Sequence, residues 1–581
     1  MQARRSRRPA LGATLLASLA LGLAAPCASH ADDTTTGDGA LTPAQLAERI
    51  DAVIAAKLAD AKLKPAPKIN DVGFLRRLSL DVRGAPPTPE EIIAFSKDKR
   101  PDKRAREIVK MLADVGYSEH WADIWNSALV GRSTVARRFV SGQFEGWVEQ
   151  QLAANLPYDA MVRDILTAEG WTDENGAAAY ALRYEVNPMD MASTSARQFL
   201  GIQIQCAQCH DHPYTDYTQK DFLGMAAYFG RTGQRRERVM TEPSPRRPKK
   251  GNAKGKAKAN PRRFGIFDRK RGTLKVNANM EAVKARDWGR AVSPSFIVKG
   301  LEGRPGKNFR ENYAQLVTNP GNTYFSQMAV NRVWSVLFGM GFVNPVEDLE
   351  QGESLHPELL AELGAAFVKS RYDLKWLIEA VLLTDTYQRS SRLSKSQEDP
   401  DKLAKRALKS SNEERRQKAA MRAALERSLF ARAELRPLSP EQLLRSVANA
   451  TGLNSFIAGR AGARQRMRQV LRQFTFTFDN GEEDQVGEFN GTIPQALLLM
   501  NSAFVNRALE SPQAGVAQLL RRYRSTRERL QRLSLMVLSR LPDKGELALY
   551  ERFIKASGGD TKAYHDLAWV LMNSSEFVFQ N

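Results

Sequence analysis

The stretch RLSLDVRGAPPTPEE, residues 77–91, predicts two consecutive helices separated by a proline-marked break. It ends in Thr88-Pro89-Glu90-Glu91, a capping box with a threonine N-cap, a proline at the first helical position and a glutamate three residues after the cap. A second stretch, RLSLMVLSRLPDKGE at residues 532–546, aligns with it without gaps and shares Arg-Leu-Ser-Leu, one proline and one glutamate. The two stretches are either related helical hairpins from the two ends of the chain or independent versions of one helix-break-helix arrangement.

Most of the remaining chain shows the helical period. Thr42-Pro43 begins a helix with its apolar residues on one face, and Ser439-Pro440-Glu441-Gln442 repeats the capping box before LLRSVANATG. Strand signals are few. FGIFDRKRGTLKVNA, residues 264–278, predicts a hairpin that turns at Arg271-Gly272, and three phenylalanines alternate as on a half-buried strand: Phe474, Phe476 and Phe478. We therefore predict a mainly α, multi-helix, two-domain protein with minor β-hairpins.

The length of 581 residues exceeds the usual size of a single hydrophobic core. Apolar residues make up 42% of the chain, which is typical of a folded protein and not of a disordered one. We place one helical domain at residues 42–235, a linker at 236–294 and a second helical domain at 295–581. After the first thirty residues, no run is long and apolar enough to form a transmembrane helix.

The first 31 residues have the composition of an export signal. Arginines at positions 4, 5, 7 and 8 precede the apolar stretch LGATLLASLALGLAA, and small residues at 28–31 offer a cleavage point before Asp32. Cleavage there removes Cys27 and leaves two cysteines in the mature chain. The predicted location is therefore the periplasm, the cell envelope or the secreted fraction, where the environment is oxidising.

The net charge of +21 is concentrated in one segment. Residues 231–271 contain 16 Lys and Arg against 3 Asp and Glu, a net +13 (16 − 3), whereas the folded remainder is nearly neutral. This segment is poor in apolar residues and rich in Pro, Gly, Ala and Lys, which predicts a disordered linker. Alternatively it tethers the protein to an acidic polymer, but the lack of interleaved aromatic residues argues against specific nucleic-acid binding.

QCAQCHDHPYTDYTQKDFLGMAAYF, residues 205–229, contains the two remaining cysteines in the motif Cys206-x-x-Cys209-His210. With only 3 Cys and 6 His in the chain, chance is a poor explanation for this motif. In c-type haem attachment, two thiols bond to the porphyrin and the adjacent imidazole ligates the iron. We therefore predict a covalent haem c held by Cys206 and Cys209, with His210 as the iron ligand.

Three other chemistries use the same residue types. A thioredoxin-like redox pair would need the motif at a helix start after a strand, and no such context is visible. A zinc site from Cys206, Cys209, His210 and His212 has suitable donors, but four ligands within seven residues can hardly surround one ion, so it would need a distant ligand. A structural disulfide is also open, although so tight a loop adds little stability.

An iron held by His210 has a sixth coordination position to be explained. His212 is too near in sequence to reach the opposite face of the haem, which favours a hydrogen bond within the loop. Met225 is the nearest downstream methionine and is the candidate sixth ligand, although methionines at helical spacing usually pack in cores. A methionine or histidine there favours electron transfer, whereas an open position allows peroxide or small-molecule chemistry.

Several of these stretches resemble one family. CAQCHDHPYTDYTQKDFLGMAAYF, with FLRRLSLDVRGAPPTPEEI and YSEHWADIWNSAL upstream, is similar to the secreted planctomycete cytochrome C-type domain. NTYFSQMAVNRVWSVLFGMGFVNPVEDLEQGESLHPELL and GTIPQALLLMNSAFVN resemble its usual companion, a secreted domain of unknown function. The resemblance spans residues 45–235 and 295–580 and implies an exported haem protein without an assigned activity. The family commonly has a basic residue where this chain has His120, so His120 is a candidate particular to this chain.

The resulting hypothesis is an exported c-type haem protein that transfers electrons or assists oxidation at the cell envelope, with a redox partner or envelope protein still to be identified. The alternative is a non-enzymatic envelope scaffold or binding protein in which the motif holds a structural metal or a disulfide. The sequence contains no GxSxG, Walker or HExxH pattern, which argues against the commonest classes of hydrolase and nucleotide-binding protein. Whether the protein is an enzyme stays open.

Overall fold

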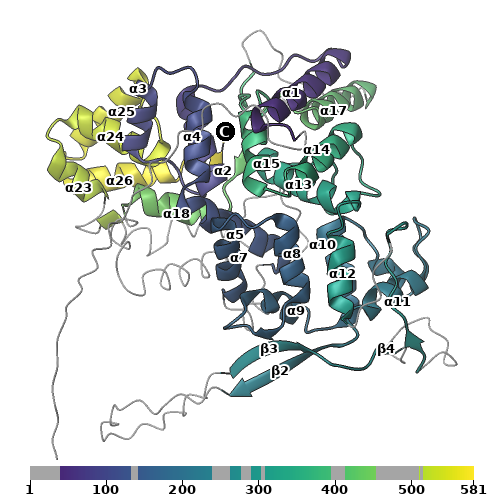
Figure 1. Ribbon diagram of the computed structural model, residues 1–581. Helices are drawn as coiled ribbons and strands as arrows, with labels where there is room; N and C mark the ends of the chain where they lie inside the picture. Colours follow the sequence, from purple (N-terminus) through teal and green to yellow (C-terminus); the bar gives the residue numbers. More distant parts are fainter. Residues whose placement is uncertain are drawn as a thin grey trace, which may run out of the picture. The chain divides into compact units, whose positions relative to one another are not determined.

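The computed structural model describes residues 40–131, 142–238, 262–275, 289–301, 308–393, 413–452, 509–510 and 515–580 (Figure 1). All of them belong to one compact unit, Ala40–Asn581. Helices dominate and the strands are short and antiparallel, which confirms the predicted mainly α fold with minor β structure. The predicted signal, most of the predicted linker and the predicted strand at Phe474, Phe476 and Phe478 lie outside the described residues.

The helices fall before and after the predicted linker. Those before it are α1 (Pro43–Asp60), α2 (Asp71–Arg83), α3 (Pro89–Lys97), α4 (Lys103–Leu112), α5 (Val115–Leu129), α7 (Gln143–Ala153), α8 (Tyr158–Thr167), η1 (Gly176–Ala178), α9 (Ala179–Arg183), α10 (Pro188–Leu200), η2 (Gln205–Gln208) and α11 (Gln219–Ala227). Those after it are α12 (Phe309–Val317), α13 (Thr323–Phe338), α14 (Pro357–Lys369), α15 (Leu374–Leu383), α17 (Glu413–Ser428), α18 (Pro440–Ala450), α23 (Gly515–Arg522), α24 (Thr526–Leu538), α25 (Lys544–Ala556), α26 (Thr561–Met572) and α27 (Ser575–Val578).

The predicted helix starts are confirmed in their hydrogen bonds. The Thr88 hydroxyl accepts a bond from the Glu91 backbone N–H at 3.2 Å, and the Glu91 carboxylate accepts one from the Thr88 N–H at 2.8 Å. Ser439 and Gln442 form the same reciprocal pair at the start of α18, and Thr42 does so with Gln45 at the start of α1. These bonds satisfy N–H groups that a helix start otherwise leaves without partners.

The strands form three small antiparallel sheets. In the first, β3 (Arg262–Asp268) lies between β1 (Gly170–Trp171) and β2 (Thr232–Arg238). The other two pair β4 (Leu274–Lys275) with β5 (Ala291–Val292), and β6 (Arg436–Pro437) with β7 (Phe579–Gln580).

The predicted hairpin at residues 264–278 is wrong in its pairing, because β3 and β4 do not pair with each other. β3 instead matches all seven residues of β2, from Thr232 opposite Asp268 to Arg238 opposite Arg262. This long ladder places Arg263 within 2.7 Å of the Glu237 carboxylate. The two-residue β4 offers β3 far fewer backbone partners than β2 does, so the distant strand prevails over the local turn.

The buried apolar residues form two clusters. The larger one takes most of its residues from the elements between α1 and α15, with Leu535 of α24 added, and therefore includes helices from both sides of the predicted linker. Tyr158 of α8, for example, stacks on Phe325 of α13 with ring centroids 5.2 Å apart. The smaller cluster joins α18 and the C-terminal helices α23 to α27, drawn in yellow in Figure 1, and includes Leu80 of α2.

The first helix of each similar stretch ends in the same way, with a left-handed residue and a serine hydroxyl bonded to the chain just beyond it. α2 and α24 each end at a residue in the left-handed conformation, Gly84 with φ of 66° and Ser539 with φ of 60°. The Ser79 hydroxyl donates to the Ala85 carbonyl at 2.6 Å, and in the second copy the aligned Ser534 donates to the carbonyl of Arg540, the counterpart of Ala85, at 2.8 Å. This shared detail favours related hairpins over independent ones.

The shared glutamate has the same role in both copies. Glu91 and Glu546 each complete a capping box at the start of the second helix, with Thr88 and Asp543 as the N-cap residues. Each glutamate also receives both arms of an arginine: Glu91 from Arg83 at 2.7 and 3.0 Å, and Glu546 from Arg540 at 2.7 Å on each oxygen. The break between the helices is therefore held by a bidentate ion pair in both copies.

Replacing Gly84 by Ala should lower the free energy of unfolding by about 2 kcal/mol, because the new methyl group occupies a left-handed position and meets buried polar atoms. An ideal Cβ at Gly84 would lie 2.4 Å from the His120 Nδ1 and 2.7 Å from an Arg445 Nη1. The matched change is Ser539→Gly in the other copy, which relieves the left-handed strain while removing a 3.1 Å hydrogen bond from Arg76. Urea denaturation should show a larger loss of unfolding free energy for Gly84→Ala than for Ser539→Gly. Equal losses would contradict the expected clash of the new methyl group at position 84.

Candidate cofactor site

The approach to the motif is set by the end of α10. This helix stops at Gly201, whose φ of 64° is left-handed. A Cβ at Gly201 would lie 2.6 Å from the Leu349 Cγ, and the Leu349 N–H donates to the Gly201 carbonyl at 2.9 Å. The chain entering the motif therefore packs closely against the loop at residues 345–350 of the second half.

The motif forms the 3₁₀ helix η2 and presents its cysteines outward. Ala207, between the two cysteines, is fully buried, as are Ile202 and Ile204 just before them. Cys206 is exposed and Cys209 is half-buried, and they form no disulfide with each other. The apolar residues thus anchor the segment to the core while the thiols stay at the surface.

His210 is exposed, and its ring is oriented by its neighbour. The Nδ1 atom lies 2.8 Å from the Asp211 carbonyl oxygen. Since a carbonyl only accepts hydrogen bonds, the neutral ring in this orientation carries its proton on Nδ1 and has its lone pair on Nε2. A backbone carbonyl at one ring nitrogen is the usual partner of a histidine whose other nitrogen binds a metal.

The start of α11 fixes the loop after the motif. The Gln219 side-chain amide donates to the carbonyls of Gln208 at 3.0 Å and Cys209 at 3.2 Å. The Gln219 backbone N–H donates to the Asp211 carboxylate at 2.9 Å. One residue at the first turn of α11 therefore holds the carbonyls of the motif and the residue that orients His210.

The two candidate sixth ligands lie in different surroundings. His212 is buried, and its ring Nδ1 accepts a hydrogen bond from the Tyr214 backbone N–H at 3.3 Å. The His212 backbone N–H donates to the Tyr217 carbonyl at 2.8 Å. The ring thus makes a hydrogen bond within the loop. Met225 lies on α11 and is fully buried in the larger hydrophobic cluster. Across the described part of the chain, no group of three or more His, Cys, Asp or Glu side chains is arranged to hold a metal ion.

The Glu350 carboxylate, in the second half of the chain, accepts hydrogen bonds from two tyrosines, one of them in the loop after the motif. The Tyr217 hydroxyl donates to Glu350 at 2.5 Å, and the Tyr324 hydroxyl of α13 donates to the same oxygen at 3.2 Å. Burial and the hydrogen bond to Glu350 raise the pKa of Tyr217 above its ordinary value. Sequence analysis missed Glu350 because no local period or spacing relates it to a motif more than a hundred residues away.

His120 does not belong to the motif region. It is buried on α5, where its Nδ1 lies 3.5 Å from Arg445 of α18. The same arginine donates to Asp123 at 2.5 Å. Burial, together with the positive charge of Arg445, lowers the pKa of His120 to about 3, so its ring is neutral at physiological pH.

The residues of the motif fit a covalent haem. The attachment needs two thiols that are accessible and outside a disulfide, and an imidazole nitrogen that is free to ligate iron. Cys206 is exposed, Cys209 is half-buried and neither is in a disulfide, and the 2.8 Å contact of the His210 Nδ1 with the Asp211 carbonyl directs Nε2 away from that bond.

Comparison with known families gives two matches. PSCyt2, described as a protein of unknown function (DUF1549), matches residues 49–234, and PSD1, a protein of unknown function (DUF1553), matches residues 309–554. This order confirms the predicted cytochrome C-type domain followed by its companion. No curated protein and no solved structure matches the chain significantly. Among the described residues, no helix has the length and apolar character needed to span a membrane.

Proposed function

Because the chain belongs to the proteins that carry a PSCyt2 domain followed by a PSD1 domain, both of unknown function, we propose that it is an exported c-type haem protein that transfers electrons at the cell envelope. Cys206 and Cys209 hold the haem through thioether bonds, and His210 ligates its iron through Nε2. The observation that carries the proposal is the 2.8 Å contact between the His210 Nδ1 and the Asp211 carbonyl, since it leaves Nε2 for the metal. A bound haem supplies a one-electron redox centre.

The surface position of the motif supports electron transfer to a partner. Cys206 and His210 are exposed, and Tyr214, four residues after His210, is 81% exposed. Electron exchange between proteins requires that the cofactor edge come close to a partner surface, and an exposed attachment loop allows that approach. The exposed aromatic ring of Tyr214 offers the partner an apolar contact beside the motif.

The second half of the chain supports the proposal by holding the loop rigid. The Gln203 amide donates to the Glu347 carbonyl at 3.2 Å, and the Leu349 N–H donates to Gly201 at 2.9 Å. Glu347 also pairs with Arg332 of α13 at 2.6 Å, and Arg332 donates to the Gln198 carbonyl at the end of α10 at 2.8 Å. These bonds hold the chain just before the motif to the PSD1 region, and the hydrogen bond from Tyr217 to Glu350 holds the loop after it, which favours a site with a constant orientation.

The test is the mass and colour of the exported protein. Full-length chain produced with its signal, in cells that contain the haem-maturation machinery, should gain the mass of one haem, show a Soret band and keep haem peroxidase staining after denaturation. Replacing Cys206 and Cys209 together by Ala should abolish all three signals, because no thioether bond can form. Tyr214→Ala is the matched control in the same loop and should retain them.

A mature wild-type chain that weighs only as much as its amino acids would overturn the proposal. A loss of two hydrogens from that mass would indicate a disulfide at the motif, and the envelope-scaffold alternative would then explain it. Equal staining of the double cysteine variant and the Tyr214 variant would also count against covalent attachment, since haem bound without thioether bonds is released on denaturation.

A further inference from the structure

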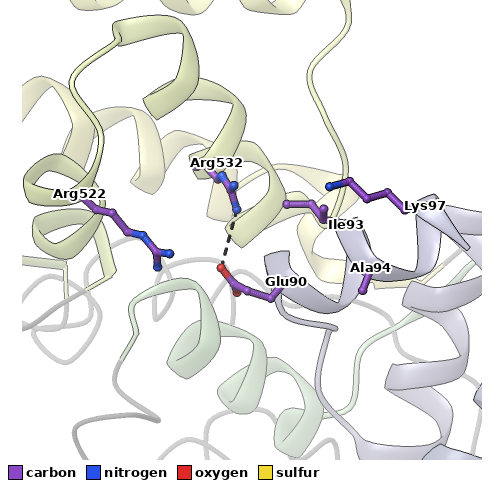
Figure 2. Close-up of a pocket in the computed structure, with 6 residues that line it drawn as sticks. All are labelled: Glu90, Ile93, Ala94, Lys97, Arg522 and Arg532. Carbon is purple, nitrogen blue, oxygen red and sulfur yellow. Dashed lines mark ion pairs between the residues drawn. The ribbon is translucent and has the colours of Figure 1, made fainter.

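A surface cavity of about 380 Å³ lies between α3 and the helices α23 and α24 (Figure 2). Its volume is within the range of small-molecule sites, about 300 to 1,000 Å³. α3 and α24 are in contact, so the two walls come from opposite ends of the chain. The lining residues are Glu90, Ile93, Ala94 and Lys97 of α3, Arg522 of α23 and Arg532 of α24.

The charged groups around this cavity do not balance. Three cationic side chains face one carboxylate, an excess of two positive charges (3 − 1). Arg532 and Glu90 face each other in Figure 2, but their nearest atoms are 3.8 Å apart, and the Glu90 side chain is 67% exposed. Such an exposed and loose pair contributes little. Among the described residues, neither Lys97 nor Arg522 lies within ion-pair distance of a carboxylate.

Two of the cations are arranged as a pair. The guanidinium groups of Arg522 and Arg532 lie 5.6 and 5.0 Å from the ring centroid of Tyr523, between them in sequence. Contact with the aromatic ring limits the positions of both side chains. A guanidinium group matches a carboxylate, sulfate or phosphate with two parallel hydrogen bonds, which an ammonium group cannot do.

The surrounding sequence concentrates positive charge at this place. Residues 521–532 contain six arginines and one glutamate, although the folded remainder of the chain is nearly neutral. Arg529 is used to hold the turn, because it donates to the carbonyls of Tyr523 at 2.7 Å and Leu520 at 3.1 Å. Arg522 and Arg532 remain directed at the cavity, and the other arginines raise the local concentration of anions.

We propose that the cavity between α3, α23 and α24 is a binding site for a small ligand with at least two oxyanion groups, whether carboxylate, sulfate or phosphate. Arg522 and Arg532 each bind one group, Lys97 adds a point charge, and Ile93 with Ala94 contacts the apolar part of the ligand. Glu90 opposes the ligand and weakens its binding. The site is independent of the haem motif, which none of its residues touches.

The experiment is calorimetric titration of the full mature chain with pyrophosphate and, separately, with trigalacturonate, at constant ionic strength. Maltotriose serves as the neutral control. We expect binding of at least one anion and none of maltotriose. Arg522→Gln should weaken anion binding at least about tenfold, because a charge-assisted bidentate contact is lost. Glu90→Gln should strengthen binding several-fold, because it removes the opposing charge.

Arg524→Gln is the matched control. Arg524 is exposed in the same basic segment but does not line the cavity, and its replacement changes the net charge as Arg522→Gln does. It should change the affinity less than about twofold. Binding of pyrophosphate alone assigns phosphate-type ligands, and binding of trigalacturonate alone assigns carboxylates. Equal weakening by the Arg522 and Arg524 variants, or no binding of either anion at millimolar concentration, would overturn the proposal.

Discussion

Replacing Arg310 by Met should lower the free energy of unfolding by about 3 to 5 kcal/mol, the typical loss when one partner of a buried ion pair is removed. Arg310, at the start of α12, is 1% exposed. Its Nε donates to both oxygens of Asp268 at 3.0 Å, and its Nη1 donates to the carbonyls of Leu166 at 3.2 Å and Ala168 at 2.9 Å. One guanidinium group therefore joins α12 to β3 and to the end of α8. Methionine fills the space but leaves the Asp268 carboxylate and two carbonyls without these partners.

An exposed arginine–aspartate pair provides the control for this change. Arg106 pairs with Asp102 at 2.6 Å on α4, but both side chains are about half exposed, at 59% and 49%. Arg106→Met should therefore cost less than about 0.5 kcal/mol. The loss of stability for Arg310→Lys should lie between the losses of these two variants. Lysine keeps the positive charge but cannot bond at once to the Asp268 carboxylate and to both backbone carbonyls. Urea denaturation followed by circular dichroism measures all three, and a loss at Arg310 no larger than at Arg106 would refute the structural role.

The His120→Gln variant should lose about 3 kcal/mol less stability than the wild type when the pH falls from 6.5 to 4. Burial, aided by Arg445, lowers the pKa of His120 to about 3 in the folded protein, against an ordinary value of 6.5. Between these two values, the unfolded chain takes up a proton that the folded chain does not bind. Stability contributed by the neutral ring is therefore complete above pH 6.5 and is lost progressively as the pH falls towards 3.

The comparison of the two proteins isolates His120 from its charged neighbours. Burial raises the pKa of Asp123 above its ordinary value, which acts in the opposite direction to His120 as the pH falls, but Asp123 is present in both proteins. Glu441 and Arg445 are likewise shared. The control is His565→Gln on α26, because His565 is only partly buried, whereas His120 is buried. The measurement is the urea midpoint at pH 6.5 and at pH 4. An equal loss of stability between these pH values in the wild type and in His120→Gln would show that the His120 ring is protonated in the folded state.

Much of the helical structure could be predicted from short stretches of sequence. The capping boxes at Thr88 and Ser439 depend only on residues three positions apart, and both are present with their expected bonds. The same holds for the two similar hairpins, because the glutamate that caps each second helix lies within the aligned letters. Helix starts are local because the groups that satisfy them are neighbours along the chain.

The strand pairing could not be predicted in this way. The segment at 264–278 has the alternation and the turn residues of a hairpin, yet β3 pairs with β1 and β2. β2 ends at Arg238 and β3 begins at Arg262, so the partners are separated by a segment without apolar periodicity. The backbone groups at the edge of a strand can pair with any strand of suitable length. The local spacing of residues therefore does not specify which strand becomes the partner.

For the candidate cofactor site, too, the sequence predicts one part and the fold determines the rest. Cys206, Cys209 and His210 lie within five consecutive residues, so the motif alone identifies the donors. Their exposure, the ring orientation of His210 and the support from Glu350 depend on α10, α11 and α13 packing together. The cavity between α3 and α24 depends more strongly on the fold, because Lys97 and Glu90 lie beside Arg522 and Arg532 only when the two ends of the chain meet.

For this protein, features that depend on a few consecutive residues can be predicted from the amino-acid sequence alone. These are the helix starts, the positions of the two thiols and the imidazole, and the similarity of the two hairpins. Chemistry shared between distant residues, such as the guanidinium group of Arg310 between three elements or the paired arginines beside α3, requires the folded chain. The reason is physical. Backbone capping involves neighbours that are always close, whereas the position of a buried charge or a cavity wall is set by the packing of apolar faces that the spacing of residues does not specify.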